Sequence, residues 1–356
     1  MRIAVGLSGG VDSSVAACKL VEAGHEVVGV TMIIWPDSKC CGSDALFDAG
    51  VVAQKLGIPH HKFDLMAQFK AEVVDPFVGA YADGRTPNPC PTCNEKLKFR
   101  HMWDAASTLT GVTHIATGHY ARVRQDPDTG RHQLLRGVDP RKDQSYMLFK
   151  LDEEQLSRLV TPLGEQTKEQ TRDDAERFGL HLAAKPDSQD LCFTSDNLSG
   201  FLAKRLPDQE RSGPIVDSSG NPLGEHGGTI HYTVGQRKGL GVAAPEPLYV
   251  LKVLPQANTL VVGPRHETVV REFSVEDVRW TSIPVPVEPE LRAAVKVRHG
   301  PNTHGALVVP RGRDGATVVL DEPLTGGVSP GQFAVFHDGD LVLGGGTISR
   351  AWPSAY

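Results

Sequence analysis

The chain has 356 residues, of which 40% are hydrophobic and 22% charged, and its net charge is −6. A chain of this length is too long for one compact core, and a chain of this composition is not disordered. Two or three domains are therefore expected. No apolar run reaches the roughly 18 to 20 residues that span a bilayer, and the first residues lack signal-peptide order, so a cytoplasmic location is predicted. The negative charge does not exclude a nucleic-acid partner, because a whole-chain balance says little about one face.

The first 120 residues alternate strand and helix patterns. Apolar, β-branched runs at 2–7 and 25–35 enclose a helical pattern at 14–22, and a second helix at 44–59 precedes a strand at 60–65. The segment VTHIATGHY repeats the pattern of a strand followed by glycine. We therefore predict an α/β domain with a doubly wound parallel sheet, which binds ligands at the carboxyl ends of its strands.

The first strand runs into the loop SGGVDSS, residues 8–14. Its two glycines permit close backbone approach, and the helix that follows offers N–H groups and the positive end of its dipole to a phosphate. The loop has neither the lysine of a Walker motif nor a G-x-G-x-x-G pattern. It resembles the SGGxDS loop of the N-type ATP pyrophosphatases, which implies ATP cleavage between the α- and β-phosphates. A glycine-rich turn without a ligand is the alternative.

A C-x-x-C pair lies in GRTPNPCPTCNEKLKF, residues 84–99. Thr92 and Glu95 have the spacing of a capping box, which predicts that a helix begins there, with Cys93 in its first turn. A helix N-terminus lowers a thiol pKa from about 8.5, so Cys93 is a candidate nucleophile. The apolar positions of this helix follow 3.6-residue spacing: Phe99, Met102, Trp103 and Ala106.

The cysteines allow three interpretations: a redox pair, metal ligands, or one catalytic thiol with an accessory neighbour. A structural zinc site would need Cys40 and Cys41 as further ligands. Cys192 lies in KPDSQDLCFTSDN, which has no helical or strand period and is predicted to be a loop. It is either a catalytic thiol or, if buried, an ordinary small apolar residue.

The remainder of the chain predicts more helix and then β-structure. Two amphipathic helices are expected between 151 and 204, and a glycine-dense, mostly β domain between 205 and 272. Its turn Gly235–Gly241 is basic and either contacts phosphates or is a plain surface loop. From 273 to 356, short strands and two Asp-Gly hairpin signals predict a small barrel or sandwich. The stretch 291–313 has basic residues and no acidic ones, so it is a candidate contact for an RNA backbone.

A series of unrelated motifs gives a closer resemblance. In order they are SGGVDSS, GRTPNP-x-x-x-CN, ATGHYAR, LLRG-x-D-x-x-KDQSY, DSQ-x-x-CF and HYTVGQRKGLG. Together they resemble the bacterial tRNA-specific 2-thiouridylases over essentially the whole chain. The resemblance implies an adenine nucleotide hydrolase-like catalytic domain at 1–204, a β-rich tRNA-contacting domain and a C-terminal antiparallel β-barrel. The implied activity is ATP-dependent 2-thiolation of the wobble uridine, position 34, of tRNA.

The same resemblance assigns residues. Cys192 matches the cysteine that carries persulfide sulfur, and Cys93 matches the assisting nucleophile that can form a disulfide with it. The ATP positions are Gly6, Leu7, Ser8, Gly9, Gly10, Val11, Asp12, Ser13, Ser14, Met32 and Gly118. The positions matched to tRNA contact are Asn88, Pro89, Cys90, His119, Lys142, Asp143, Gln144, Arg298, His299 and Gln332.

One position departs from the family pattern. Many members have aspartate where this chain has Cys90, so Cys90, Cys93 and Cys192 are together a candidate ligand set for a [4Fe-4S] cluster. The implied cofactors are ATP and Mg²⁺, with the cluster as a competing sulfur route. The implied partners are tRNA and a sulfur donor, which is a persulfide carrier protein, a cysteine desulfurase or sulfide. Two alternative functions are another ATP-pyrophosphatase-type synthetase with a small substrate, and a non-catalytic RNA-binding protein.

Overall fold

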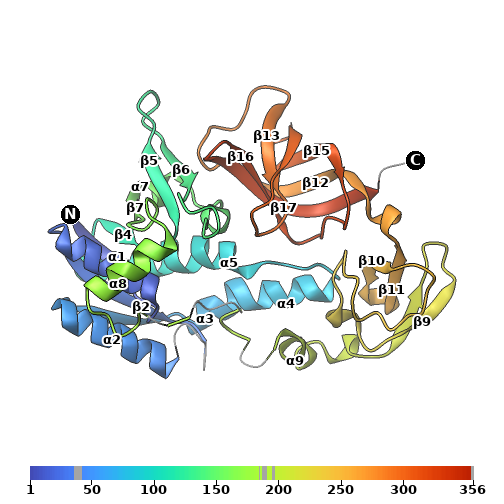
Figure 1. Ribbon diagram of the computed structural model, residues 1–356, viewed down its shortest axis with the longest axis horizontal. Coiled ribbons are helices and arrows are strands. Elements are labelled where there is room, and N and C mark those ends of the chain that lie inside the picture. The colour runs from blue at the N-terminus through green and yellow to red at the C-terminus, as the bar shows by residue number, and fades with distance from the viewer. Residues whose placement is uncertain (36–41, 184, 187–190, 195–196, 354–356) are drawn as a thin grey trace.

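The computed structural model describes residues 1–35, 42–183, 185–186, 191–194 and 197–353. Figure 1 shows three parts along an elongated molecule. An α/β part with the N-terminus lies at one end, a small β-rich part lies at the other, and a barrel of strands lies between them on one side. No helix in the described ranges is both long and apolar enough to cross a membrane.

The α/β part contains a five-stranded parallel sheet in the order β3-β2-β1-β4-β7. Its strands are β1 (Arg2–Gly6), β2 (Glu26–Ile33), β3 (His60–Asp64), β4 (His114–Ala116) and β7 (Leu159–Val160). Side chains alternate between the two faces of β1, since Ile3 and Val5 pack with helices α1 and α2 while Ala4 belongs to the core on the other face. Helices thus cover both faces, which confirms the predicted doubly wound fold.

On the first face lie α1 (Val11–Glu22) and α2 (Ser43–Leu56), with α8 (Lys168–Arg177) packed on α1. Gly57 ends α2 with a left-handed φ of 65°. The helix expected after residue 151 is shorter: α7 (Glu153–Arg158) ends where Leu159 turns extended, and the chain forms edge strand β7. Parallel pairing with β4 outweighs the helical pattern there.

On the second face lie two interrupted helical segments with π-helical turns. They are α3 (Met66–Phe69), η1 (Lys70–Val74) and α4 (Asp75–Ala82), followed by α5 (Pro89–Thr92), η2 (Cys93–Met102) and α6 (Trp103–Thr110). The four apolar positions predicted for the second segment are all buried. The predicted capping box is wrong, because the segment begins at Pro89 and the Asn88 side chain accepts the Cys90 N–H at 3.1 Å. Proline at the first helical position and asparagine before it outweigh Thr92.

The central part is a four-stranded sheet in the order β10-β11-β8-β9. The glycine-rich segment predicted that this part is mostly β. Its strands are β8 (Gly213–Val216), β9 (Pro222–His226), β10 (Leu248–Leu254) and β11 (Thr259–Pro264). Short helices lie in the connections within and between the parts: η3 (Ser145–Met147), α9 (Leu198–Ala203), η4 (Pro207–Gln209), η5 (Thr229–His231), η6 (Pro255–Ala257) and η7 (Arg265–Thr268).

The C-terminal part is a closed antiparallel barrel, which confirms the predicted fold class. Six strands follow the order β12-β15-β14-β13-β16-β17, and pairing of β12 with β17 closes the ring. They are β12 (Val270–Arg279), β13 (Leu291–Lys296), β14 (His304–Arg311), β15 (Gly315–Leu324), β16 (Phe333–Asp338) and β17 (Leu341–Pro353). Both Asp-Gly pairs lie in or next to hairpin turns, between β14 and β15 and between β16 and β17.

The barrel is joined to the α/β part by strand pairing and charge. A hairpin of β5 (Ala121–Gln125) and β6 (His132–Arg136) extends from the α/β part, and Leu135 pairs with Leu341 of β17. Asp143 and Lys296 form an ion pair of 3.2 Å, with side chains only 3% and 4% exposed. A pair this buried fixes the loop before η3 against β13 of the barrel.

Candidate nucleotide and sulfur-transfer site

The loop between β1 and α1 is shaped by its own serines. The Ser8 N–H donates to Ser13 Oγ at 3.2 Å, and the hydroxyls of Ser13 and Ser14 donate to the Gly10 carbonyl at 3.1 and 2.8 Å. These bonds curl the chain over the start of α1. Because the first N–H groups of a helix have no partner inside it, this start is suited to bind an anion.

Two glycines allow other segments to approach this loop. Gly9 has a φ of 66°, and a Cβ there would lie 2.4 Å from the Ala45 carbonyl oxygen of α2. A Cβ on Gly118, after β4, would lie 2.6 Å from the carbonyl carbon of Asp12. The predicted ATP positions 8–14 and Gly118 are therefore neighbours, at the carboxyl ends of adjacent strands.

The remaining positions matched to ATP are Gly6, Leu7 and Met32, at the end of β1 and on the neighbouring strand β2. Gly6 is the last residue of β1 and Leu7 follows it, and the Leu7 carbonyl accepts a hydrogen bond from the Thr31 hydroxyl at 2.7 Å. Met32 lies on the neighbouring strand β2 and packs, half-buried, against the core on the second face of the sheet. They support the loop from the sheet.

Asp12, in the first turn of α1, is held by two donors. Lys168 Nζ lies 2.6 Å from Asp12 Oδ1, and the Tyr120 hydroxyl donates to the same oxygen at 2.9 Å. The Lys168 side chain is only 9% exposed. It is the first residue of α8, whose start carries a complete capping box between Thr167 and Gln170.

Lys185 reaches the loop from another segment. Its Nζ donates to the Gly9 carbonyl at 2.8 Å and to Asp48 Oδ2 at 2.7 Å. His181 contacts the other Asp48 oxygen at 3.0 Å. Burial alone would raise the pKa of Asp48, but hydrogen bonds from Lys185 and His181 overcome it and hold that pKa below its usual value.

Sequence reasoning missed both lysines. Lys168 is 156 residues from Asp12 along the chain, and Lys185 is 176 residues from Gly9. No spacing rule relates such distant positions. The capping box at Thr167 marks a helix start rather than a contact. Lys185 begins the segment KPDSQDLCFTSDN, whose pattern does not relate it to the loop.

The C-x-x-C pair begins the second helical segment. Because the segment starts at Pro89, Cys90 lies in its first turn and Cys93 in the second, which corrects the predicted position of Cys93. Cys90 is exposed as a residue, but the protein packed around its thiol raises the pKa of that thiol. The positive charge of Lys98 lowers the pKa, and its effect is the smaller of the two. The first-turn position therefore does not by itself make Cys90 a thiolate.

His119 lies close enough to Lys98 to feel its positive charge. Burial of the ring, with Lys98 adding to the effect, holds the pKa of His119 well below its usual value. Its Nδ1 lies 2.6 Å from the Thr117 hydroxyl, and its ring is 6.3 Å from that of Phe99. His119 is therefore a neutral hydrogen-bonding group at pH 7 rather than a cation for phosphate.

Cys192 lies in a turn, and the neighbouring Phe193 anchors it. The Phe193 ring is buried and makes edge contacts with Phe77 and Phe201 at 5.3 and 5.2 Å. Cys93 and Cys192 are both partly buried and border the same hydrophobic core. Two segments about 100 residues apart in sequence thus bring their thiols to one core.

The cysteines do not form a metal site among the described residues. Within the described residues, no group of three or more histidine, cysteine or acidic side chains is arranged to hold a metal ion. Cys90, Cys93 and Cys192 are all described, so in this conformation they do not form a three-thiolate cluster site. Cys40 and Cys41, the further zinc ligands considered, lie outside the described residues.

The segment around Asn88, Pro89 and Cys90 is held by the barrel. Thr86 N–H donates to the Pro330 carbonyl at 2.8 Å, and Gln332 Nε2 donates to the Thr86 carbonyl at 2.7 Å. A pocket of about 330 Å³ opens at this junction, where all three parts of the chain meet. It is lined by Thr86, Thr233, Val234, Gly235, Gln236, Val297, Arg298, Val328, Ser329 and Gln332.

The predicted tRNA positions 142–144 have internal roles as well. Gln144 Oε1 accepts the Tyr120 N–H at 3.0 Å, and Asp143 is buried in its ion pair with Lys296. Burial alone would raise the pKa of Asp143, but Lys296 and the Ser145 N–H hold it below its usual value. Lys142 is half-buried.

The acid-free stretch 291–313 does not form one continuous basic face, and its contact with an RNA backbone stays a prediction. Lys296 is buried against Asp143, and Arg292 pairs with Asp321. Acidic residues distant in sequence neutralise these cations, which a local count cannot detect. Arg298 and His299 are exposed, and the His299 ring lies 6.0 Å from that of Tyr146.

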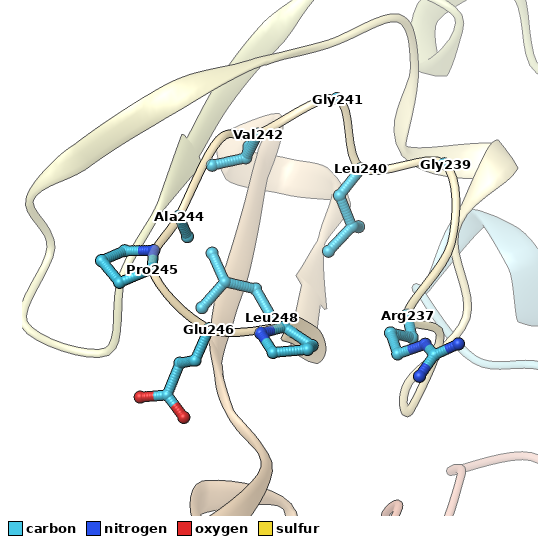
Figure 2. Close-up of a pocket in the computed structure, with 10 residues that line it drawn as sticks. Arg237, Gly239, Leu240, Gly241, Val242, Ala244, Pro245, Glu246 and Leu248 are labelled. Carbon is cyan, nitrogen blue, oxygen red and sulfur yellow. The ribbon is translucent and has the colours of Figure 1, made fainter.

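Figure 2 shows a second pocket, of about 440 Å³, in the central part. Glycines and apolar residues of the loop 237–248 line it, with Arg237 at one side and Glu246 at another. The loop contains most of the basic turn Gly235–Gly241. Figure 1 places this part at the opposite end of the molecule from α1 and α2.

Three family models match the chain in succession. They are described as a tRNA methyl transferase HUP domain at residues 1–196, a tRNA methyl transferase PRC-barrel domain at 199–264 and an aminomethyltransferase beta-barrel domain at 270–348. These matches place the chain among the tRNA-modifying enzymes, with the α/β part as its HUP domain.

Full-length relatives specify the family. A tRNA-specific 2-thiouridylase MnmA of Gloeothece citriformis is 46% identical over 98% of this chain and 99% of the relative. The same enzyme of Acetivibrio thermocellus is 43% identical over 98% of this chain and 99% of the relative. The chain belongs to the tRNA-specific 2-thiouridylase (MnmA) family. The predicted family and enzyme class, a tRNA sulfurtransferase, are confirmed.

A distant solved structure is similar to part of the chain. It is the U34-tRNA thiolase NcsA from Methanococcus maripaludis with its [4Fe-4S] cluster, which is 17% identical with a TM-score of 0.36. The match covers 59% of this chain and 67% of that one. Similarity at this level says nothing about the cysteines of this chain.

Proposed function

We propose that this enzyme replaces the C2 oxygen of the wobble uridine of tRNA, position 34, with sulfur at the expense of ATP. The observation that carries the proposal is the similarity to 2-thiouridylases over 98% of the chain. The loop at the start of α1 adds physical support. Its serine hydrogen bonds fold the chain over the helix start, and its glycines let neighbouring segments approach closely, which suits a polyphosphate. Neither a small-substrate synthetase nor a non-catalytic RNA-binding protein accounts for that similarity.

In the first step the C2 oxygen of the base attacks the α-phosphorus of ATP, and pyrophosphate leaves. The loop and α1 bind the departing pyrophosphate, and the base carries AMP on its C2 oxygen. Adenylation is needed because a carbonyl oxygen is a poor leaving group, whereas AMP is a stable one. Mg²⁺ that accompanies ATP would be held mainly by phosphate oxygens, with Asp12 as the nearest carboxylate in the loop.

In the second step a persulfide on Cys192, supplied by a sulfur donor, attacks C2 through its terminal sulfur, and AMP is expelled. Cys93 then attacks the Cys192 sulfur, so the C2-bound sulfur departs as the thiocarbonyl and a Cys93–Cys192 disulfide forms. A thiol reductant restores both cysteines with two electrons. The two thiols bordering one hydrophobic core support this pairing.

Pyrophosphate release is the test of the first step. Pyrophosphate should form from ATP only when a tRNA with an unmodified wobble uridine is present, and Asp12→Asn should slow its release at least about tenfold. Release that ignores tRNA and depends on a small molecule would favour the synthetase instead.

The iron–sulfur route uses Cys90, Cys93 and Cys192 as cluster ligands and competes with the persulfide route. These thiols do not form a ligand set in this conformation. Iron analysis and absorption spectroscopy after anaerobic purification test it. Active, iron-free protein supports the persulfide route, whereas activity that tracks about four irons per chain contradicts it.

A further inference from the structure

The nucleotide loop contains no lysine, yet two lysine ammonium groups reach it from distant segments. We propose that Lys185 binds the β- and γ-phosphates of ATP, and then pyrophosphate, while Lys168 positions Asp12. The inference rests on the proposed ATP-binding role of the loop. It assigns to Lys185 the charge that a Walker motif places inside the loop itself.

Lys185 has the geometry for phosphate contact. Its Nζ lies 2.8 Å from the carbonyl of Gly9, which stands directly before the turn into α1. An ammonium has three N–H donors, so it can add a phosphate oxygen without giving up both present partners. Its side chain is 39% exposed, which leaves freedom for that adjustment.

Asp48 prepares Lys185 for this role. Its carboxylate is 17% exposed and is held from two sides, by Lys185 at 2.7 Å and by His181 at 3.0 Å. The lowered pKa of Asp48 keeps it ionised at neutral pH, so it fixes a charged Lys185 beside the loop. A cation fixed in advance stabilises developing negative charge with little reorganisation.

Lys168 differs from Lys185 in burial and therefore in role. At 9% exposure, 2.6 Å from Asp12 Oδ1, it is enclosed between α8 and α1, which lie side by side in Figure 1. The Tyr120 hydroxyl shares the same carboxylate oxygen. Lys168 thus acts through Asp12, whereas Lys185 stands where it can touch the nucleotide.

The test compares ligands with and without the outer phosphates. Dissociation constants for Mg–ATP, pyrophosphate and AMP are measured by calorimetry on wild type, Lys185→Met and Lys185→Arg. Loss of one charge-assisted hydrogen bond should weaken ATP and pyrophosphate at least about tenfold and AMP less than about twofold. Lys185→Arg should keep the ATP-to-AMP affinity ratio within about threefold of wild type.

Lys55→Met is the matched control. Lys55 Nζ also donates to the carbonyl of a left-handed glycine, Gly179, but away from the loop, so its loss should leave all three constants unchanged. Equal weakening of ATP and AMP by Lys185→Met would reduce Lys185 to a structural support of Gly9 and overturn the inference, as would no change in ATP affinity. Wild type that binds no ATP would instead contradict the proposed function.

Discussion

The nucleotide loop and the cysteine region are built in different ways. The loop is seven consecutive residues whose serines bond to one another and to the Gly10 carbonyl across at most five positions. The cysteine region joins a segment near Cys93 and the turn at Cys192, both in the α/β part, with the barrel loop at Gln332, and these are far apart in the sequence. A contiguous loop can be read from its spacing, whereas an assembled site depends on the whole fold.

The largest expected effect is a complete loss of sulfur transfer with nucleotide binding retained, which separates the cysteine region from the loop. Cys192→Ser should abolish 2-thiouridine formation, because a hydroxyl cannot carry persulfide sulfur, while ATP and tRNA binding stay within about twofold of wild type. Nucleoside mass spectrometry and binding measurements check it. The control is Cys18→Ala, which removes a buried thiol whose pKa is raised to about 11 and should retain thiolation. Loss of tRNA binding in Cys192→Ser would assign that cysteine a structural role.

The next effect weakens the contact that joins the barrel to the α/β part. Lys296→Met leaves the Asp143 carboxylate buried and unpaired, which should cost about 3–5 kcal/mol of unfolding free energy in chemical denaturation. Because the fold lowers the pKa of Asp143, the stabilisation exists above its ordinary value of 3.8 and is lost as pH falls through the folded pKa. The difference from wild type should therefore persist at pH 7 and shrink below about pH 4.

Two controls sharpen that measurement. Adding Asp143→Asn to Lys296→Met should recover part of the loss, since it removes the unpaired charge. Arg2→Met breaks the exposed pair with Glu26 and should cost less than about 1 kcal/mol. A cost for Lys296→Met as small as that for Arg2→Met would contradict the account of a buried ion pair joining the barrel to the α/β part.

The smallest effect in this series affects the loop alone. Gly9→Ala adds both a strained φ and a clash with the Ala45 carbonyl, and should cost about 1–3 kcal/mol of stability and weaken ATP binding. Gly24→Ala is matched in φ, at 77°, but its Cβ meets nothing within 4 Å, so it should cost about 1 kcal/mol and spare ATP. Equal ATP affinity in both variants would show that close packing on α2 is irrelevant to the loop.

Sequence reasoning reached the parallel sheet, the barrel and the contiguous loop because each has a local signature in period, turn residues or glycine spacing. It misplaced the start of the helix that carries Cys93, since two capping signals four residues apart compete and only packing decides between Asn88 and Thr92. It also counted Lys296 as surface charge. Lys185 and the Asp143–Lys296 pair are contacts across the fold, and no local pattern encodes them.

The most direct test of the central claim is nucleoside mass spectrometry of tRNA after incubation with the enzyme, ATP, Mg²⁺ and a sulfur source under anaerobic conditions. The account predicts 2-thiouridine at the wobble position only when ATP is present, with one pyrophosphate released per thiolated base. Thiolation without ATP, or pyrophosphate release with no thiolated tRNA, would contradict it.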